Sequence, residues 1–266
     1  MSDTRLLELR ARTPQRPPGP ELAQVLDLTS PSGLRLRRYR PVERPRPLMV
    51  YLHGGGWVIG GLDSHDTTCR RIARECDVEV LAVDYRLAPE HPCPAALDDA
   101  VEVLRWARPV AVAGDSSGGY LATMACLRLR DEGCAVPALQ VLLCPNTDLT
   151  LSCASVTDKG SGSGLDAETL AWFVAQWVPE PAARAAASPL LSPNLYGLPT
   201  TLLVTAENDA LRDEGDAYAA RLAEAGVKVV HRQEPGLAHG FIQDASAEAA
   251  AAHERVFSDI RALIPR

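Results

Sequence analysis

A serine flanked by glycines stands near the middle of the chain, in Gly114-Asp115-Ser116-Ser117-Gly118-Gly119. An apolar run precedes it, at 110–113, and a stretch typical of a helix follows, at 120–130. The pattern G-x-S-x-G between a strand and a helix is typical of a nucleophilic serine on a sharp turn, where glycines avoid clashes. The N-terminus of the helix would direct N–H groups toward the serine oxygen, where negative charge develops. We therefore predict that Ser116 is a nucleophile, although a plain glycine-rich turn could have the same pattern.

A histidine must accept the proton of such a serine, because the hydroxyl alone is a weak nucleophile at neutral pH. Three histidines follow Ser116 in the chain: His231, His239 and His253. His231 lies within a strand pattern and His253 within a helix pattern, whereas His239 lies in a loop, 234–240, after the last expected strand. A catalytic histidine in a parallel sheet follows a late strand, so His239 is the predicted general base. The alternative is an ordinary surface histidine.

A carboxylate should hold the histidine in the correct tautomer and stabilise its charged form. The expected strand at 201–205 is followed by three acidic residues: Glu207, Asp209 and Asp213. Asp209 fits the expected position best. Spacing alone does not exclude the other two, which could instead cap the next helix or pair with Arg212.

Three glycines, Gly54, Gly55 and Gly56, follow the apolar run 48–52 and His53. Glycines let backbone N–H groups approach an oxygen closely, as an oxyanion hole requires, and the N–H of Ser117 would complete the set. Alone, the three glycines could form only a flexible turn. Trp57 follows them directly, and we expect it to contact the substrate in a modest pocket.

Strand and helix patterns alternate along most of the chain, which predicts a mostly parallel sheet with helices on both faces. A hairpin is expected first, at 23–28 and 34–39. The later strands are expected at 48–52, 78–83, 110–113, 139–144, 201–205 and 227–232, and the helices at 65–76, 94–107, 117–130, 214–225 and 247–263.

The alternation is interrupted between Cys144 and Pro199, where the expected elements are a glycine- and serine-rich stretch, 158–164, and one helix, 166–178. Long insertions in compact domains are usually functional. We expect one domain, 1–266, whose cap elements lie at 1–20 and 150–196. The alternative is a long surface loop with one helix.

Composition excludes several classes of function. The 266 residues are 46% apolar and have a formal net charge of −7 without a long basic run, so no nucleic-acid partner is expected. No signal peptide or membrane span is apparent. The seven cysteines form no C-x-x-C pair, so we expect free thiols, no metal and a cytoplasmic location.

The same motifs resemble the bacterial hormone-sensitive-lipase-like esterases of the α/β-hydrolase superfamily. The resemblance runs from about Pro47 to the C-terminus. It rests on five motifs: Tyr51-Leu52-His53-Gly54-Gly55-Gly56-Trp57, Asp84-Tyr85-Arg86-Leu87-Ala88-Pro89-Glu90-His91, Gly114 to Gly119, Asp209 to Gly215, and His239-Gly240-Phe241.

The resemblance implies an α/β-hydrolase fold with an eight-stranded sheet and a small helical cap. It also implies hydrolysis of carboxylic esters through an acyl-enzyme, without a metal or cofactor. A thin cap and Trp57 beside the glycine loop suggest a modest pocket, so we expect short-acyl esters as substrates. Ser116, Asp209 and His239 would be catalytic, and Gly55, Gly56 and Ser117 would be the oxyanion donors. Residues 84–91 would brace the loops beneath the site.

Three alternatives remain open at this point. The same catalytic groups could hydrolyse the amide or acetyl group of a metabolite. Gibberellin receptors share the fold without catalysis, but they lack the histidine that stands here at position 239. A homodimer is possible through the last strand, 227–232, if that strand is an exposed edge.

Overall fold

Eight strands form one sheet in the computed structural model, which describes residues 3–11, 18–160 and 164–265. The strand order is β1-β2-β4-β3-β5-β6-β7-β8, and all neighbours are parallel except the pairs β1–β2 and β2–β4. The strands are β1 (Gln24–Thr29), β2 (Arg35–Arg40), β3 (Leu48–Leu52), β4 (Glu79–Val83), β5 (Ala111–Asp115), β6 (Leu139–Leu143), β7 (Thr200–Asn208) and β8 (Val229–Ala238). The predicted hairpin and mostly parallel sheet are confirmed.

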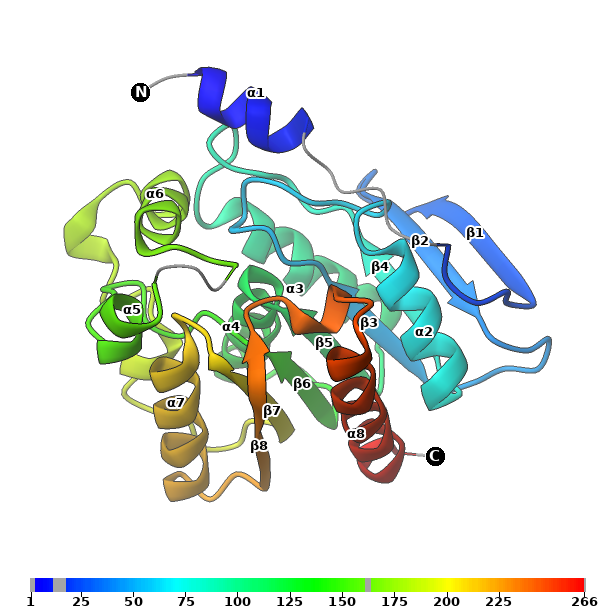
Figure 1. Ribbon diagram of the computed structural model, residues 1–266. Helices are drawn as coiled ribbons and strands as arrows, with labels where there is room; N and C mark the ends of the chain where they lie inside the picture. Colours follow the sequence, from blue (N-terminus) through cyan, green and yellow to red (C-terminus); the bar gives the residue numbers. More distant parts are fainter. Residues whose placement is uncertain (1–2, 12–17, 161–163, 266) are drawn as a thin grey trace.

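Helices cover both faces of the sheet (Figure 1). The helices of the described residues are α1 (Asp3–Ala11), α2 (Asp66–Cys76), α3 (Ala95–Ala107), α4 (Ser117–Asp131), α5 (Ala154–Asp158), α6 (Ala167–Trp177), α7 (Arg212–Glu224) and α8 (Ala247–Leu263). Of these, α1, α5 and α6 lie beyond the end of the sheet or beside it (Figure 1). Side chains alternate along each strand. In β3, Val50 and Leu52 therefore pack in the core beneath α3, α4 and α7, whereas Met49 and Tyr51 pack beneath α2 and α8.

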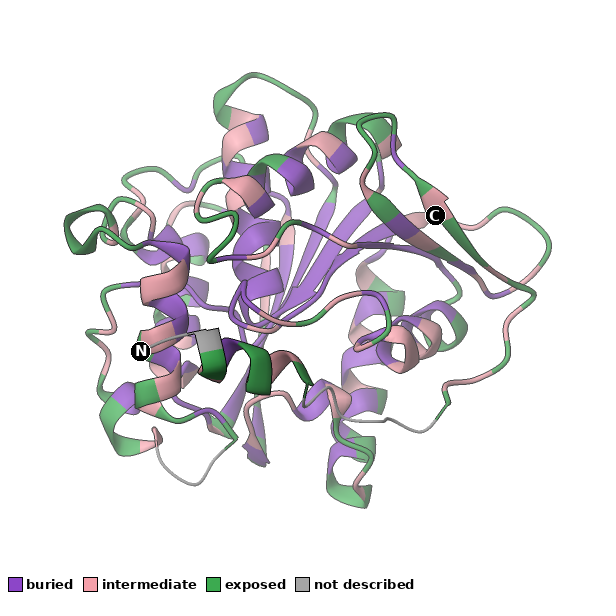
Figure 2. Ribbon diagram, turned by 90° about the horizontal axis from the view of Figure 1, so that it is seen from above, coloured by how far each residue is buried: buried purple, intermediate pink, exposed green. Residues whose placement is uncertain are grey.

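The central strands β3 to β6 are buried along almost their whole length, and exposed residues lie on the outer faces of the helices, in the connecting loops and on β1 (Figure 2). Strands buried on both faces have continuous apolar runs instead of an alternating pattern. This is why these strands could be recognised from sequence almost to the residue.

The interruption after β6 contains α5, α6 and two short 3-10 helices, η1 (Pro181–Ala183) and η2 (Pro189–Leu191). The helix predicted at 166–178 is confirmed as α6, whereas α5 was not predicted. Parts of the predicted ranges lie outside the described residues. These are residues 1–2 and 12–17 of the first predicted cap range, and residues 161–163 of the second, which also belong to the glycine- and serine-rich stretch.

Strand β8 is longer than predicted. It continues through 234–238, a stretch that the sequence assigns to a loop, because its residues pair with the extended end of β7 up to Asn208↔Ala238. A register shift between Ala206 and Asn208 accompanies this last pair. The strands therefore end directly before Asp209 and His239, which brings these two residues side by side.

Strand β8 forms one edge of the sheet, as a dimer through this strand requires. The dimer itself stays a prediction.

Within the described parts of the chain, no helix combines the length and the apolar character that crossing a membrane demands.

Candidate active site

Ser116 lies on the turn between β5 and α4, with backbone angles φ 53° and ψ −121°. This is an unfavourable conformation for a residue with a side chain. The turn is held by the Ser116 N–H, which donates to the carbonyl of Leu143 at 2.8 Å. A Cβ atom at Gly114 would lie 2.3 Å from Gly118, and one at Gly118 would lie 2.0 Å from the Leu52 carbonyl oxygen. Both glycines are therefore required by close packing, as the motif predicts.

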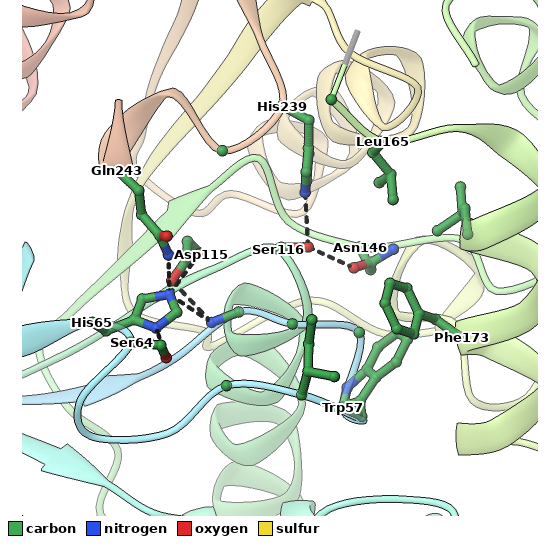
Figure 3. Close-up of a pocket in the computed structure, with 18 of the residues that line it drawn as sticks. Trp57, Ser64, His65, Asp115, Ser116, Asn146, Leu165, Phe173, His239 and Gln243 are labelled. Carbon is green, nitrogen blue, oxygen red and sulfur yellow. Dashed lines mark hydrogen bonds and ion pairs between the residues drawn. The ribbon is translucent and has the colours of Figure 1, made fainter. Parts of the chain in front are cut away.

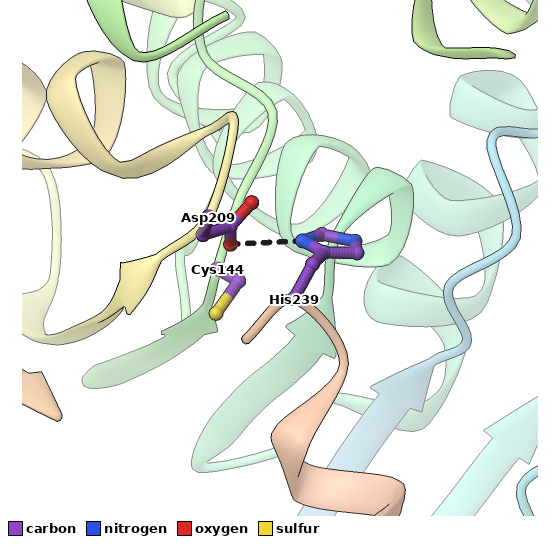
Figure 4. Close-up of side chains that lie close together, drawn as sticks. All are labelled: Cys144, Asp209 and His239. Carbon is purple, nitrogen blue, oxygen red and sulfur yellow. Dashed lines mark hydrogen bonds and ion pairs between the residues drawn. The ribbon is translucent and has the colours of Figure 1, made fainter. Parts of the chain in front are cut away.

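Ser116, His239 and Asp209 form a continuous line of hydrogen bonds (Figures 3 and 4). Ser116 Oγ lies 3.0 Å from His239 Nε2, and His239 Nδ1 lies 2.8 Å from Asp209 Oδ2. The other carboxylate oxygen of Asp209 accepts from the N–H of Leu211 at 2.9 Å. The three side chains come from the carboxyl ends of β5, β7 and β8, so the sheet brings together residues that are far apart in sequence.

The two acidic rivals of Asp209 have other partners. Glu207 accepts from the Gly236 N–H at 2.7 Å, and Asp213 accepts from the Ser155 N–H at 2.8 Å and from Arg212. Neither contacts His239. Of the three acidic residues, Asp209 is therefore the one that contacts His239, and its catalytic role stays a prediction.

The two other histidines after Ser116 are also accounted for. His231 pairs with Asp216 at 2.9 Å, and His253 lies 2.8 Å from the carbonyl oxygen of Phe241. Both belong to structural contacts away from the serine, in agreement with the sequence analysis.

The pairing with Asp209 determines the electrostatics of His239. Burial alone would lower the pKa of the imidazole, but the charge and hydrogen bond of Asp209 outweigh it and raise the pKa above its ordinary value. Because the ionised carboxylate can only accept, His239 Nδ1 carries a proton, and in the neutral ring Nε2 is left to accept from Ser116 Oγ. This is the tautomer that general-base catalysis requires.

The glycine loop faces the serine, but its first amide is occupied. The N–H of Gly54 donates to Asp115 Oδ1 at 3.0 Å. The amides of Gly55 and Gly56 donate to no other residue that the structure describes. A Cβ atom at Gly55 would lie 2.2 Å from the Ile59 carbonyl oxygen, and one at Gly56 would lie 2.2 Å from the Phe173 ring. Both glycines have positive φ angles, 127° and 59°, so only glycine fits this loop without strain.

Asp115 links the glycine loop to the serine turn. Besides the Gly54 N–H, its carboxylate accepts from the Tyr51 hydroxyl at 2.7 Å and lies 3.3 Å from His65 Nε2. Burial would raise the pKa of Asp115, but His65 and the Tyr51 hydroxyl outweigh burial, and the pKa is lowered to about 2. A buried carboxylate that stays charged is a strong anchor for its donors.

Residues 84–91 lie beneath the glycine loop. The Tyr85 hydroxyl donates to the His53 carbonyl oxygen at 2.6 Å, and its ring stacks on the His53 imidazole with centroids 4.1 Å apart. The N–H of Ala88 donates to the carbonyl of Trp57 at 2.9 Å. These contacts fit the bracing function that the family resemblance implies.

A pocket of about 350 Å³ opens beside Ser116 (Figure 3). Ser64, His65 and Gln243 line one side, and Leu165, Leu170 and Phe173 line the other, with Leu9 of α1 contributing to the wall. Gln243 and Asp115 both contact His65, so the polar side is a connected network.

Trp57 lines the same pocket, but its side chain is fully buried. Its ring stacks on Trp177, with centroids 5.6 Å apart, and meets the ring of Tyr120 edge-on. A substrate contact of Trp57 therefore stays a prediction. The structure shows its ring packed against Trp177 of α6.

Cys144 lies next to the Asp209–His239 pair (Figure 4). One potential ligand atom from each of these three residues lies within 4.8 Å of the other two. Burial raises the pKa of the Cys144 thiol well above its usual range, and the nearby carboxylate of Asp209 adds to the effect. Since metals bind the thiolate form, this group is a poor metal site. Metal-free catalysis stays a prediction.

Two residues near the serine were missed by sequence reasoning. Asn146 Oδ1 lies 3.4 Å from Ser116 Oγ, and the buried carboxylate of Glu214 accepts from the backbone N–H groups of Thr147 and Asp148. Asn146 follows β6 at the same edge of the sheet as the other site residues, and this position is a signal that could have identified it.

Comparisons with known proteins agree with this geometry. A family model described as the alpha/beta hydrolase fold matches residues 49–243. The chain is 40% identical to the carboxylic ester hydrolase LipN of Mycobacterium tuberculosis, over 94% of this chain and 73% of that protein. It is 41% identical to the ethyl acetate hydrolase of Pseudomonas putida, over 84% of this chain and 77% of that protein.

Among solved structures, a hyperthermophilic esterase from the archaeon Pyrobaculum calidifontis is 35% identical, with a TM-score of 0.85 over 97% of this chain and 90% of that one. Matches of this length and identity show that this chain is homologous to these proteins. The chain belongs to the α/β-hydrolase superfamily, in its branch of hormone-sensitive-lipase-like esterases.

Proposed function

We propose that this protein is a serine carboxylesterase that hydrolyses short-acyl esters through an acyl-enzyme. The observation that carries the proposal is the line of hydrogen bonds from Ser116 through His239 to Asp209, beside the unoccupied amides of Gly55 and Gly56. The relatives named as ester hydrolases support the same chemistry.

In the first half of the reaction, His239 Nε2 takes the proton of the Ser116 hydroxyl while Ser116 Oγ attacks the ester carbonyl carbon. The charge of Asp209 stabilises the imidazolium that forms. The N–H groups of Gly55, Gly56 and Ser117 receive the negative oxygen, assisted by the N-terminus of α4. The imidazolium then donates its proton to the leaving alcohol oxygen as the carbon–oxygen bond breaks.

The second half repeats these steps with water. His239 Nε2 takes a proton from a water molecule, which attacks the acyl carbon. The acyl bond to Ser116 Oγ breaks, the proton returns to the serine oxygen, and the carboxylic acid leaves. No group besides those of the chain and water is needed for this cycle.

Three observations support short acyl groups and a cap. Leu9 of α1 and Leu165, Leu170 and Phe173 of the 150–196 segment close the pocket from above the sheet. The two segments are joined, since Arg5 of α1 lies 3.1 Å from Glu168 of α6. The name of the Pseudomonas putida relative, an ethyl acetate hydrolase, supports a small acyl group. A cytoplasmic location stays a prediction.

A chain-length series tests the proposal. We expect p-nitrophenyl acetate and butyrate to be hydrolysed with higher kcat/KM than the decanoate, and Ser116→Ala to abolish all three activities. A matching butyryl p-nitroanilide in the same series tests the amide alternative. Full activity of Ser116→Ala would refute the proposal.

A further inference from the structure

We propose that Asn146 selects the acyl group, by donating a hydrogen bond from its side-chain amide to an oxygen atom two bonds away from the ester carbonyl carbon. The preferred substrates would be esters of 2-alkoxy acids and similar oxygen-bearing short acids. This inference rests on the proposed function and specifies its substrate class.

The side-chain amide of Asn146 lies next to the serine, and its N–H donor has no partner among the described residues. Its Oδ1 atom lies 3.4 Å from Ser116 Oγ, whereas its Nδ2 atom is buried and has no partner within the described part of the chain. The residue is 2% exposed and lines the pocket. Figure 3 shows Nδ2 turned away from Ser116, toward the side where Leu165 and Phe173 lie. A buried donor without an acceptor is unfavourable, and a substrate oxygen would satisfy it.

Of the two halves of the ester, the acyl half is the one that lies near the Asn146 amide. The leaving oxygen must lie next to His239 Nε2, because that atom gives it a proton. His239 and Asn146 approach Ser116 Oγ from different directions (Figure 3). The acyl chain therefore extends away from His239, and its first atoms beyond the carbonyl lie near the amide of Asn146.

Asn146 cannot easily turn away. Its own N–H lies 3.3 Å from the Ser116 carbonyl oxygen, and the next two N–H groups donate to the buried carboxylate of Glu214, at 2.6 and 3.1 Å. The Thr147 hydroxyl also donates to the backbone carbonyl of Glu214. This support fixes the loop from behind, so the amide is preorganised.

The surroundings make the donor selective. The neighbouring wall consists of Leu165, Leu170 and Phe173, all buried and none able to accept a hydrogen bond from a side chain. In such a wall, a substrate without an oxygen leaves the amide unsatisfied, whereas one with an oxygen gains a hydrogen bond. Sites of this kind discriminate through groups left unpaired by the wrong substrate.

The experiment compares p-nitrophenyl butyrate with p-nitrophenyl methoxyacetate, which has the same number of chain atoms and an oxygen in place of one methylene. We compare wild type with Asn146→Leu, which keeps the branched shape of the side chain but has no amide, and with Asn146→Ala. Dividing each variant's kcat/KM by that of the wild type removes the difference in intrinsic reactivity. We expect this quotient to be about 3- to 10-fold lower for methoxyacetate than for butyrate, the size of one neutral hydrogen bond.

Equal quotients for both esters in a folded variant would overturn the proposal, and so would a larger loss for butyrate. A selective loss for p-nitrophenyl 2-hydroxybutyrate but not for methoxyacetate would also overturn it, because the amide would then be presenting its carbonyl oxygen. Measuring both variants guards against a packing defect in one of them. If wild type hydrolysed neither ester, the proposed function itself would fail, which is a distinguishable result.

Discussion

His239 Nδ1 lies 2.8 Å from Asp209 Oδ2 because β7 and β8 end as a pair, at Asn208 and Ala238. This relationship selects Asp209 from three acidic candidates. We predict that Asp209→Asn lowers kcat by about 10⁴-fold, since the amide would favour the wrong tautomer of the histidine. Steady-state kinetics on p-nitrophenyl butyrate would measure it.

The controls for this variant are Glu207→Gln and Asp213→Asn. Both remove a negative charge from the same stretch, but neither carboxylate contacts His239, so we expect most of the activity to remain. If Glu207→Gln were as damaging as Asp209→Asn, the assignment of the acid would be wrong.

The pH profile should report the raised pKa of His239. The histidine must be neutral to accept a proton, so kcat/KM should rise with pH and reach half its plateau above about 6.5, the ordinary value for histidine. Asp209→Asn should move this midpoint to lower pH, because the carboxylate is what raises the pKa. A midpoint that stays unchanged in the variant would contradict this explanation.

The contact between Gly56 and the Phe173 ring gives a prediction about the cap. Gly56→Ala should lower kcat by about 10²- to 10³-fold, comparable to the loss of one oxyanion donor, because its Cβ would meet the ring at 2.2 Å and displace the loop. Adding Phe173→Ala makes space for the methyl group and should restore part of the activity. Kinetics of the single and double variants measure the coupling, and a double variant no better than Gly56→Ala would argue against this contact.

Asp115 should contribute to stability in acid. Its pKa is about 2 in the folded protein and near 3.9 in an unfolded chain, so the folded state binds the proton less readily. The contribution, about 2 kcal/mol, is fully present above pH 4 and is lost as the pH falls toward 2. Urea denaturation at several pH values should show a shallower acid dependence for Asp115→Asn than for wild type. Parallel curves would refute this role.

Much of the site could be predicted from sequence because its motifs are local. The glycines around Ser116 and the glycines after His53 belong to motifs of five or six residues, and the buried strands have continuous apolar runs. The order serine, acid, histidine then restricts the remaining choices.

What could not be predicted depends on contacts between distant segments. The sequence favours Asp209 but does not exclude Glu207 and Asp213, because the contact with His239 depends on the register of β7 and β8, including its shift near Asn208. The burial of Trp57 depends on Trp177 of α6, 120 positions later in the chain. Asn146 belongs to no motif that the sequence analysis used; its position after β6 suggests the site, and its distance from Ser116 identifies it.

Covalent labelling tests the central claim most directly. Wild-type protein treated with an organophosphate such as diethyl p-nitrophenyl phosphate should gain one diethylphosphoryl group, located on Ser116 by peptide mass spectrometry, in step with the loss of esterase activity. Ser116→Ala should gain none, and His239→Ala should react far more slowly. Labelling at another residue that accounts for the lost activity, or full esterase activity in Ser116→Ala, would contradict the account.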